Sequence, residues 1–359
     1  MGKVAALAAP KPGADLEWHE VERREVHDDD VEVEIKYSGI CGSDLHQVRS
    51  EWGDNSEMFP MCPGHEMVGV VKSVGKNVTK FKEGDLAGVG NFVDSCRECG
   101  PCKAGDEHLC NEGFVFTYAG KMKYDHSPCK GEVTQGGYSA SIVCNERYVV
   151  SIPKNLDLSK VAPVLCAGIT VFSPLNHYGL KEGMKFGVAG LGGLGHMAVK
   201  FANAMGAKVV VLSRGTKKKD DALELGAHEY LDSTDEDAMK EAAGSFDFIL
   251  DTISAKHAVA DYLPLLVADG KLINVGMAPE PLEVPSMALA FKRLVYAGSL
   301  IGGMKELQEC LDFCGKHEIH PEVEFISCDK VNEAYKRVDN ADVRFRFVMD
   351  MSTLKKPEE

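Results

Sequence analysis

The alternation of apolar and polar residues divides this chain into two regions that follow different patterns. Up to about Pro153, short alternating runs such as those at residues 31–35 and 68–74 lie between glycines, which is typical of half-buried β-strands. After Pro153, apolar runs of four to six residues alternate with helical patterns. This second pattern predicts a parallel sheet with crossover helices. We expect strands at residues 185–189, 208–212, 246–251, 271–275 and 294–298, and helices at 194–205, 218–225 and 255–266.

The length and the last part of the sequence indicate two domains. The chain has 359 residues, which exceeds the about 250–300 residues that one hydrophobic core usually serves. After about Met304 the sequence is polar and mixed, with a late strand expected near residues 343–349. We therefore predict an α/β protein: a mostly-β domain at residues 1–165, an inserted nucleotide-binding domain at 166–303, and a return to the first domain at 304–359.

The composition disfavours several classes of partner and location. A formal charge of -15 argues against nucleic-acid or anionic-membrane partners, because both bind basic surfaces. No apolar run reaches the ~18 residues of a membrane span, and the apolar stretch near the amino terminus is too short for a secretory signal. We therefore expect a cytoplasmic protein.

Four cysteines lie within fifteen residues, in the spacing C-x2-C-x2-C-x7-C: Cys96, Cys99, Cys102 and Cys110. Four thiolates at this spacing can close a tetrahedral zinc site, with Zn–S distances of about 2.3 Å. The first three share the spacing of ferredoxin ligands, but the fourth lacks the proline that follows it in the bacterial iron–sulfur run. Disulfides are disfavoured because cytosolic thiols stay reduced. We predict a structural zinc lobe at residues 96–110, with an iron–sulfur centre and unligated thiols as alternatives.

A glycine-rich turn follows the first predicted strand of the second region. Gly190, Gly192 and Gly195 match G-x-G-x-x-G, and the turn also contains Gly193 and Leu194. The first glycine permits the tight turn, the second lets the backbone approach a pyrophosphate, and the third lets the helix pack on the strand. We therefore predict a Rossmann-type dinucleotide site, with a merely tight strand–helix turn as the alternative.

The end of the second predicted strand indicates which dinucleotide binds. An acidic residue there would hold the ribose 2′-hydroxyl of NAD, but the position is Ser213 and no carboxylate follows until Asp220. Arg214 and Lys218 add positive charge that can neutralise a 2′-phosphate. We expect NADP(H), with Ser213, Arg214 and Lys218 as contacts. The alternative is a solvated lysine run at a helix start.

Residues outside the four-cysteine lobe are candidates for a catalytic zinc site, which needs about three protein ligands. They are Cys41, His65, Glu66 and Cys166. Each is unremarkable alone, because a buried cysteine often packs as a small hydrophobic residue. Together with a dinucleotide turn, they would combine a Lewis acid with a hydride donor in one chain.

These motifs resemble those of the zinc-dependent medium-chain alcohol dehydrogenases, and within them the cinnamyl alcohol dehydrogenase branch. The resemblance covers nearly the whole chain, and its marks are GICGSDLH at 39–46, PGHEMVGVV at 63–71, the four-cysteine lobe, LCAGIT at 165–170 and AGLGGLGH at 189–196. It implies a GroES-like catalytic domain with an inserted Rossmann domain, two zinc ions per chain and a homodimer.

The resemblance also implies residue roles. Cys41, His65 and Cys166 would hold the catalytic zinc, and Glu66 would join them when water or substrate leaves. Asp44 would orient one ligand side chain by hydrogen bonding.

In the same way, Ser43 would relay a proton from the alcohol, and His46 would pass it toward solvent through the cofactor ribose. Alternatively, Ser43 is a turn residue and His46 a surface histidine. Further cofactor contacts are expected from Thr170, Asn274, Val275 and Ser299.

A loop at residues 112–135 is longer than in the plant members of this family. It contains Phe114, Phe116, Tyr118, Tyr124 and Cys129, and its aromatic rings could stack on a ring substrate or pack locally. Our leading hypothesis is an NADP(H)-dependent, zinc-dependent alcohol dehydrogenase that reduces aromatic or medium-chain aliphatic aldehydes. A polyol dehydrogenase and a non-catalytic zinc-binding protein on the same fold are the alternatives.

Overall fold

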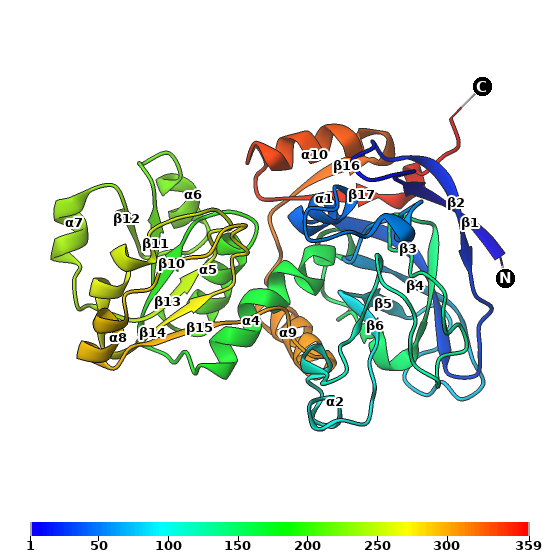
Figure 1. The fold of residues 1–359 in the computed structure, drawn as a ribbon, viewed down its shortest axis with the longest axis horizontal. Helices are drawn as coiled ribbons and strands as arrows, with labels where there is room; N and C mark the ends of the chain where they lie inside the picture. The colour runs from blue at the N-terminus through cyan, green and yellow to red at the C-terminus, as the bar shows by residue number, and fades with distance from the viewer. Residues whose placement is uncertain (1, 358–359) are drawn as a thin grey trace. The chain divides into compact units, whose positions relative to one another are not determined.

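A computed structural model describes residues 2–357 of the chain. These residues form two compact units. One contains the chain up to Cys166 together with the residues from Gly302 onward, and the other is Ala167–Ile301. The first unit therefore contains both the blue N-terminal strands and the red C-terminal segment of Figure 1.

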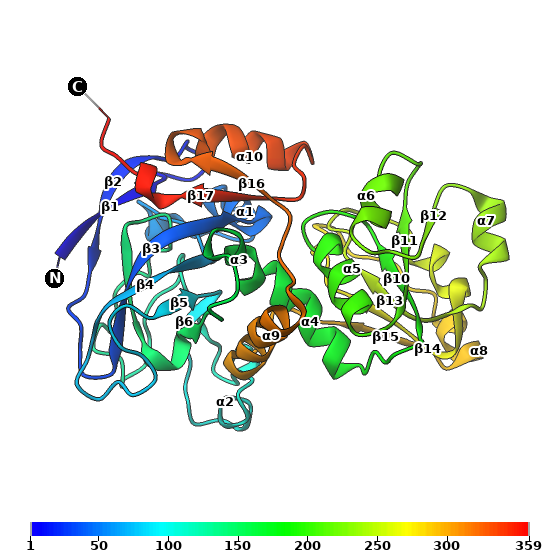
Figure 2. The same ribbon diagram turned by 180° about the vertical axis from the view of Figure 1, so that it is seen from behind.

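The first unit is mostly β. Its strands are β1 (Gly2–Ala8), β2 (Glu17–Arg23), β3 (Asp30–Ile40), β4 (Met67–Val74), β5 (Leu86–Val89), β6 (Phe92–Asp94), β7 (Val115–Phe116), β8 (Ser141–Asn145), β9 (Val150–Ser151), β16 (Val323–Ser327) and β17 (Arg346–Asp350). Its helices are α1 (Gly42–Val48), α2 (Gly100–Ala104), α3 (Leu158–Val161), α9 (Met304–His317) and α10 (Val331–Asp339). A seven-stranded sheet has the order β16-β17-β3-β4-β5-β9, and β8 also pairs with β3. Figures 1 and 2 both show α10 beside β16 and β17.

The central strand β3 shows why this sheet forms and which residue it positions. Val31, Val33 and Ile35 are buried while Glu34 between them is exposed, which is the period-two pattern of a strand with one face on the core. Near its end, β3 pairs with β17 as well as with β4. The strand ends at Ile40, so the sheet fixes the position of the next residue, Cys41.

The second unit contains a six-stranded sheet. Its strands are β10 (Lys185–Ala189), β11 (Lys208–Ser213), β12 (Glu229–Asp232), β13 (Phe246–Asp251), β14 (Leu266–Asn274) and β15 (Val295–Gly298). Its helices are α4 (Ala167–His177), α5 (Gly195–Ala204), α6 (Lys219–Glu224), α7 (Glu236–Glu241) and α8 (Ser286–Lys292). The strands run parallel in the order β12-β11-β10-β13-β14-β15, with buried apolar residues such as Phe246 and Ile249 in the centre.

One predicted helix is wrong. Residues 255–266 form two short 3-10 turns, Val259–Asp261 and Leu263–Leu265, followed at once by β14. Pro264 removes a backbone donor that a continuous helix would need. In addition, His257 hydrogen-bonds Asp251 at 2.8 Å through Nε2, which holds the start of the segment against β13.

No single helix within residues 2–357 is both long and apolar enough to cross a bilayer. One bent pair, Leu158–Leu165 with Ala167–His177, meets the criteria of length and composition only when both members are counted together.

Candidate functional site

Four metal-binding side chains from three parts of the chain converge in the first unit. Cys41 follows β3, His65 and Glu66 precede β4, and Cys166 precedes α4. Their donor atoms all lie within 4.8 Å of one another. The Sγ atoms of Cys41 and Cys166 are 3.9 Å apart, close to the about 3.8 Å that two thiolates take around tetrahedral zinc and far from a disulfide bond of about 2.05 Å. The donor set therefore fits a zinc ion.

Asp44 fixes the geometry of this cluster from a fully buried position. Its carboxylate accepts the backbone N–H groups of Cys41 at 3.0 Å and Gly64 at 3.1 Å. It also pairs with His65 Nδ1 at 3.0 Å and accepts the Tyr138 hydroxyl at 3.1 Å. Because Nδ1 of His65 is engaged, Nε2 is left as the ligand atom. The sequence did not single out Tyr138 as a contact of Asp44. The one trace of its position is Gly64, because a Cβ added there would lie 2.5 Å from the Tyr138 ring.

The electrostatics of the cluster favour a cation. Burial works to lower the pKa of His65, but the Asp44 carboxylate and the Cys41 thiol raise that pKa well above its usual value. The hydrogen bond with Cys166 is the main cause that lowers the pKa of Cys41 well below its usual value. The same hydrogen bond, together with burial, raises the pKa of Cys166 well above its usual value, so one thiol of the pair keeps its proton and a divalent ion would displace that proton on binding.

Glu66 is held by an arginine that the sequence did not point to. Arg346, the first residue of β17, donates to Glu66 Oε1, while Glu66 Oε2 has no hydrogen-bond partner among the described residues. Burial raises the pKa of Glu66 to about 7, against the opposing effect of Arg346. A Cβ on Gly39 would lie 2.1 Å from Glu66 Oε2, so glycine is required beside this carboxylate. The orphaned oxygen fits a group that can join a metal.

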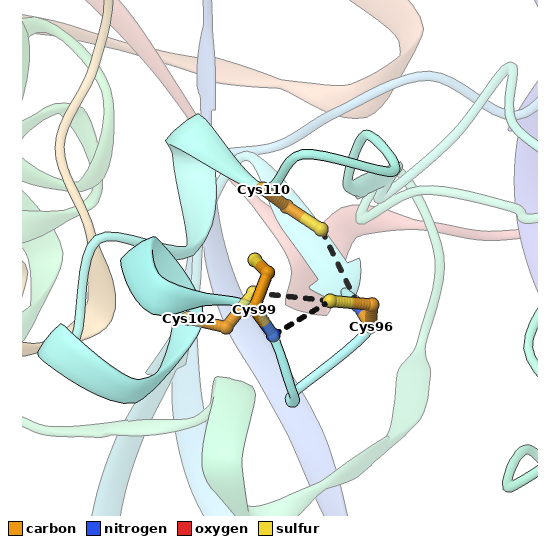
Figure 3. Close-up of side chains that lie close together, drawn as sticks. All are labelled: Cys96, Cys99, Cys102 and Cys110. Atoms are coloured by element: carbon orange, nitrogen blue, oxygen red, sulfur yellow. Dashed lines mark hydrogen bonds between the residues drawn. The ribbon is translucent and has the colours of Figure 1, made fainter.

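The four closely spaced cysteines form a local lobe, which Figure 3 shows: Cys96, Cys99, Cys102 and Cys110. Their sulfur atoms lie within 4.8 Å of one another, and those of Cys96 and Cys102 are 3.8 Å apart, again the spacing expected for tetrahedral zinc. The Cys99 amide donates to Cys96 Sγ at 3.3 Å, and the Cys96 amide donates to Cys110 Sγ at 3.5 Å. A backbone hydrogen bond from Cys102 is the main cause that lowers the pKa of Cys99 to about 6. The lobe thus has a donor set for a structural zinc.

Two candidates for proton transfer lie on α1. Ser43 Oγ is 3.6 Å from Cys41 Sγ, which places its hydroxyl beside the metal-binding cluster. His46 is half-buried, pairs with Glu51 through Nδ1 and stacks on Trp52 with ring centroids 5.0 Å apart. Within residues 2–357, no hydrogen bond joins Ser43 to His46. A proton path between them therefore needs an intermediate group.

The glycine-rich turn of the second unit has the geometry of an anion site. Gly190 has a φ of +88°, and a Cβ on Gly195 would lie 2.2 Å from the Gly190 carbonyl oxygen. In contrast, a Cβ on Gly192 would meet nothing within 4 Å, so space remains there for a ligand. Helix α5 begins at Gly195 and directs its N-terminal N–H groups at this turn, with Gly193 and Leu194 completing it.

The expected cofactor residues surround the same end of the sheet. Ser213 ends β11, Arg214 is exposed, and Lys218 Nζ donates to the Leu191 carbonyl at 2.6 Å. At the end of β14, the side-chain amide of Asn274 donates to Asp251 Oδ2 at 3.2 Å, and the backbone N–H of Val275 donates to the Asp251 carbonyl at 2.9 Å. The backbone N–H of Ser299 donates to the Asn274 carbonyl at 3.0 Å. Thr170 is buried on α4, which packs against α5 through Phe172 and Phe201.

Sequence comparison now decides the family. The model of the alcohol dehydrogenase GroES-like domain matches residues 27–154, and that of the zinc-binding dehydrogenase matches residues 193–316. An NADP-dependent alcohol dehydrogenase C 1 from Mycolicibacterium smegmatis is 49% identical over 356 residues, which cover 99% of this chain and 100% of that protein. The chain belongs to the zinc-binding alcohol dehydrogenase family.

Solved structures agree with this family. A cinnamyl alcohol dehydrogenase from Sorghum bicolor superposes with a TM-score of 0.94 at 43% identity, covering 100% of both chains. A cinnamyl alcohol dehydrogenase from Helicobacter pylori, complexed with NADP(H), superposes with a TM-score of 0.88 at 43% identity, covering 98% of this chain and 99% of that one. The predicted fold class, a GroES-like domain combined with a Rossmann-type domain, is therefore confirmed.

The long loop of this dehydrogenase touches both metal-binding groups. Tyr118 stacks on His65 with ring centroids 5.8 Å apart, and the Tyr124 hydroxyl lies 3.7 Å from Cys110 Sγ and donates to the Gly113 carbonyl. Phe114 packs on Phe116 at 4.7 Å, and Cys129 lies 3.4 Å from Arg24. The rings of Phe114 and Tyr124 thus pack locally, while 45% of Phe116 is exposed and free to meet a ligand.

Proposed function

We propose that this dehydrogenase uses NADP(H) to interconvert primary alcohols and aromatic or medium-chain aliphatic aldehydes. The observation that carries the proposal is the convergence of Cys41, His65, Glu66 and Cys166, with donor atoms within 4.8 Å of one another. Two thiolates and one imidazole are a usual ligand set for catalytic zinc in alcohol dehydrogenases. Full-length relatives named as alcohol dehydrogenases support the same reaction.

The chemistry divides between bound groups and the chain. A zinc ion supplies Lewis acidity to the carbonyl oxygen, and reduced nicotinamide supplies the hydride. Asp44 keeps His65 in one tautomer and orientation through their 3.0 Å hydrogen bond. Ser43, whose hydroxyl lies beside Cys41, delivers a proton to the substrate oxygen during reduction, and His46 exchanges that proton with solvent.

The proposed preference for NADP(H) rests on the end of β11. Ser213 replaces the carboxylate that would repel a 2′-phosphate, and Arg214 and Lys218 supply positive charge in the following residues. The relative from Mycolicibacterium smegmatis is named NADP-dependent, and the structure from Helicobacter pylori was solved with NADP(H).

A substrate and cofactor screen tests this proposal. We expect reduction of cinnamaldehyde-like and medium-chain aldehydes with kcat/KM about 10–100-fold higher for NADPH than for NADH, because charge-assisted hydrogen bonds to the phosphate contribute about 1.5–3 kcal/mol. Equal rates with both cofactors would contradict the cofactor assignment. Polyols turned over faster than any aldehyde would contradict the substrate class, and two zinc ions per chain without turnover would favour a non-catalytic protein.

A homodimer is also proposed. Strand β15 is at the end of the six-stranded order, where a partner strand can pair with it. Exposed apolar side chains lie close to it in sequence, including Phe291 with 82% exposed, Met287, Val295 and Leu300. Covering them would remove apolar surface from water. Light scattering should give about twice the 39.0 kDa of one chain, and a monomer would contradict the proposal.

We propose a cytoplasmic location because six of the eight predicted zinc ligands are cysteines that must stay reduced to bind metal.

A further inference from the structure

We infer that Tyr230 and Asp232 of β12 set the preference for a 2′-phosphorylated nucleotide, by holding the backbone of the loop at residues 213–218 in place. The inference rests on the proposed use of NADP(H) and goes beyond it, because neither residue belongs to the phosphate-contacting set. Strand β12 lies beside β11, and Asp232 stands opposite Ser213 in the register.

Both backbone polar groups of Gly215 are held by β12. The Gly215 amide donates to Asp232 Oδ1 at 2.8 Å, and the Tyr230 hydroxyl donates to the Gly215 carbonyl at 2.7 Å. Gly215 has a φ of +65°, a left-handed conformation that leaves no side chain in the way of these contacts. Two residues before Gly215, the Ser213 carbonyl accepts the Ser233 amide at 3.0 Å. The segment that carries Ser213 and Arg214 is thereby fixed on both sides.

The cation in this segment remains available for a ligand. Arg214 is exposed, and within residues 2–357 it forms no ion pair with a carboxylate. Lys218, at the other end of the loop, is tied to the glycine-rich turn through the Leu191 carbonyl. A loop anchored at Gly215 and at Lys218 presents Arg214 in a defined position, and such pre-organisation improves affinity by reducing the entropy lost on binding.

Asp232 would be expected to repel a phosphate, but its charge is already engaged. Oδ1 accepts the Gly215 amide, the Thr234 amide at 2.9 Å and the Thr234 hydroxyl at 2.7 Å. The two roles, repulsion of the phosphate and support of the loop, predict effects of opposite sign when the carboxylate is removed. Repulsion predicts tighter NADPH binding by an Asp232→Ala variant, and support predicts weaker binding.

The experiment measures nucleotide binding to the full-length zinc-loaded chain by calorimetry. Tyr230→Phe and Asp232→Ala should each raise the Kd for NADPH about tenfold, the loss of about one hydrogen bond, while the Kd for NADH changes less than twofold. The same split should appear between 2′,5′-ADP and 5′-AMP, which isolate the adenosine half of the ligand. Tyr296→Phe, the same change on β15 at the far end of the sheet order, should alter none of these values.

Several results would overturn the inference. Tighter NADPH binding by Asp232→Ala would show that repulsion dominates. Unchanged NADPH affinity in Tyr230→Phe would show that its hydrogen bond does not position the loop, and an equal loss for NADPH and NADH would indicate a general structural role. If the wild-type chain binds both dinucleotides equally, the proposed cofactor is wrong and this inference falls with it. If the wild-type chain prefers NADPH and both variants keep that preference, this inference alone fails.

Discussion

The two cysteine-containing groups of the first unit are built in opposite ways. In the lobe, four ligands lie within fifteen residues, and their contacts are mainly with one another and with neighbouring amides. In the catalytic group, the ligands are up to 125 positions apart, and buried residues outside the ligand set hold them. Asp44 accepts hydrogen bonds from four different residues there.

Because the two groups are built differently, we expect the loss of each metal to have a different effect. A lobe with short helices and few apolar residues gains its order from the ion, so metal binding contributes to local folding. The catalytic group is held in addition by its sheet, by the Asp44 network and by the contact between Arg346 and Glu66. Loss of the lobe metal should therefore reduce stability, and loss of the catalytic metal should reduce activity.

The largest effect is expected from Cys166→Ala. Removal of one of three main ligands should leave one zinc ion per chain and lower kcat by at least about 1,000-fold, because Lewis-acid assistance is worth several kcal/mol. Circular dichroism should remain that of the wild type. Cys144→Ala is the matched control, because Cys144 is buried on β8 outside both groups. An active Cys166→Ala variant with two zinc ions would contradict the ligand assignment.

A smaller effect is expected from Asp44→Asn. The amide nitrogen cannot accept the hydrogen bonds that the carboxylate accepts, so zinc affinity at the catalytic group should fall about 10–100-fold. Competition with a chelator measures this loss. Tyr138→Phe, which removes only one of the four donors, should lose less. If the variant lost affinity for both zinc ions to the same extent, the substitution would act on the fold as a whole rather than on His65.

The smallest effect on activity is expected from Cys99→Ala in the lobe. The variant should retain the catalytic zinc and lose no more than a few-fold in kcat at low temperature. Its Tm should fall by about 5–10 °C, since the lobe loses the ion that orders it. Limited proteolysis should then cut within residues 96–135 first. An unchanged Tm with one zinc ion missing would show that the lobe folds without metal.

The contrast also explains what could be read from the sequence. Local patterns predicted most strands of the second unit and the four-cysteine lobe, whereas the catalytic ligand set was inferred from the resemblance to a family. The structure brings the members of each set together. Strand β12 was missed because Glu229–Asp232 is a half-exposed segment with no apolar run. The helix expected at 255–266 failed because helical spacing competed with Pro264 and with the contact between His257 and Asp251.

Residues that act on the ligands across long separations were also missed. Arg346 reaches Glu66 over 280 positions, and Tyr138 reaches Asp44 over 94. Neither belongs to a motif of metal ligands, and no local pattern reports which distant segment will pair with β3. Only the close approaches of Gly39 and Gly64 left a trace in the sequence, and a glycine alone does not name its neighbour.

The positions of the ligands along the chain have a consequence during synthesis. The lobe has all its cysteines once Cys110 is made, whereas the catalytic group waits for Cys166, which comes 56 residues later (166 minus 110). At about 5–20 residues per second, this interval is roughly 3–11 s. Arg346 is added a further 180 residues later (346 minus 166). A nascent chain can therefore acquire its two ions in a set order, with the structural ion first and the catalytic ion after its pocket exists.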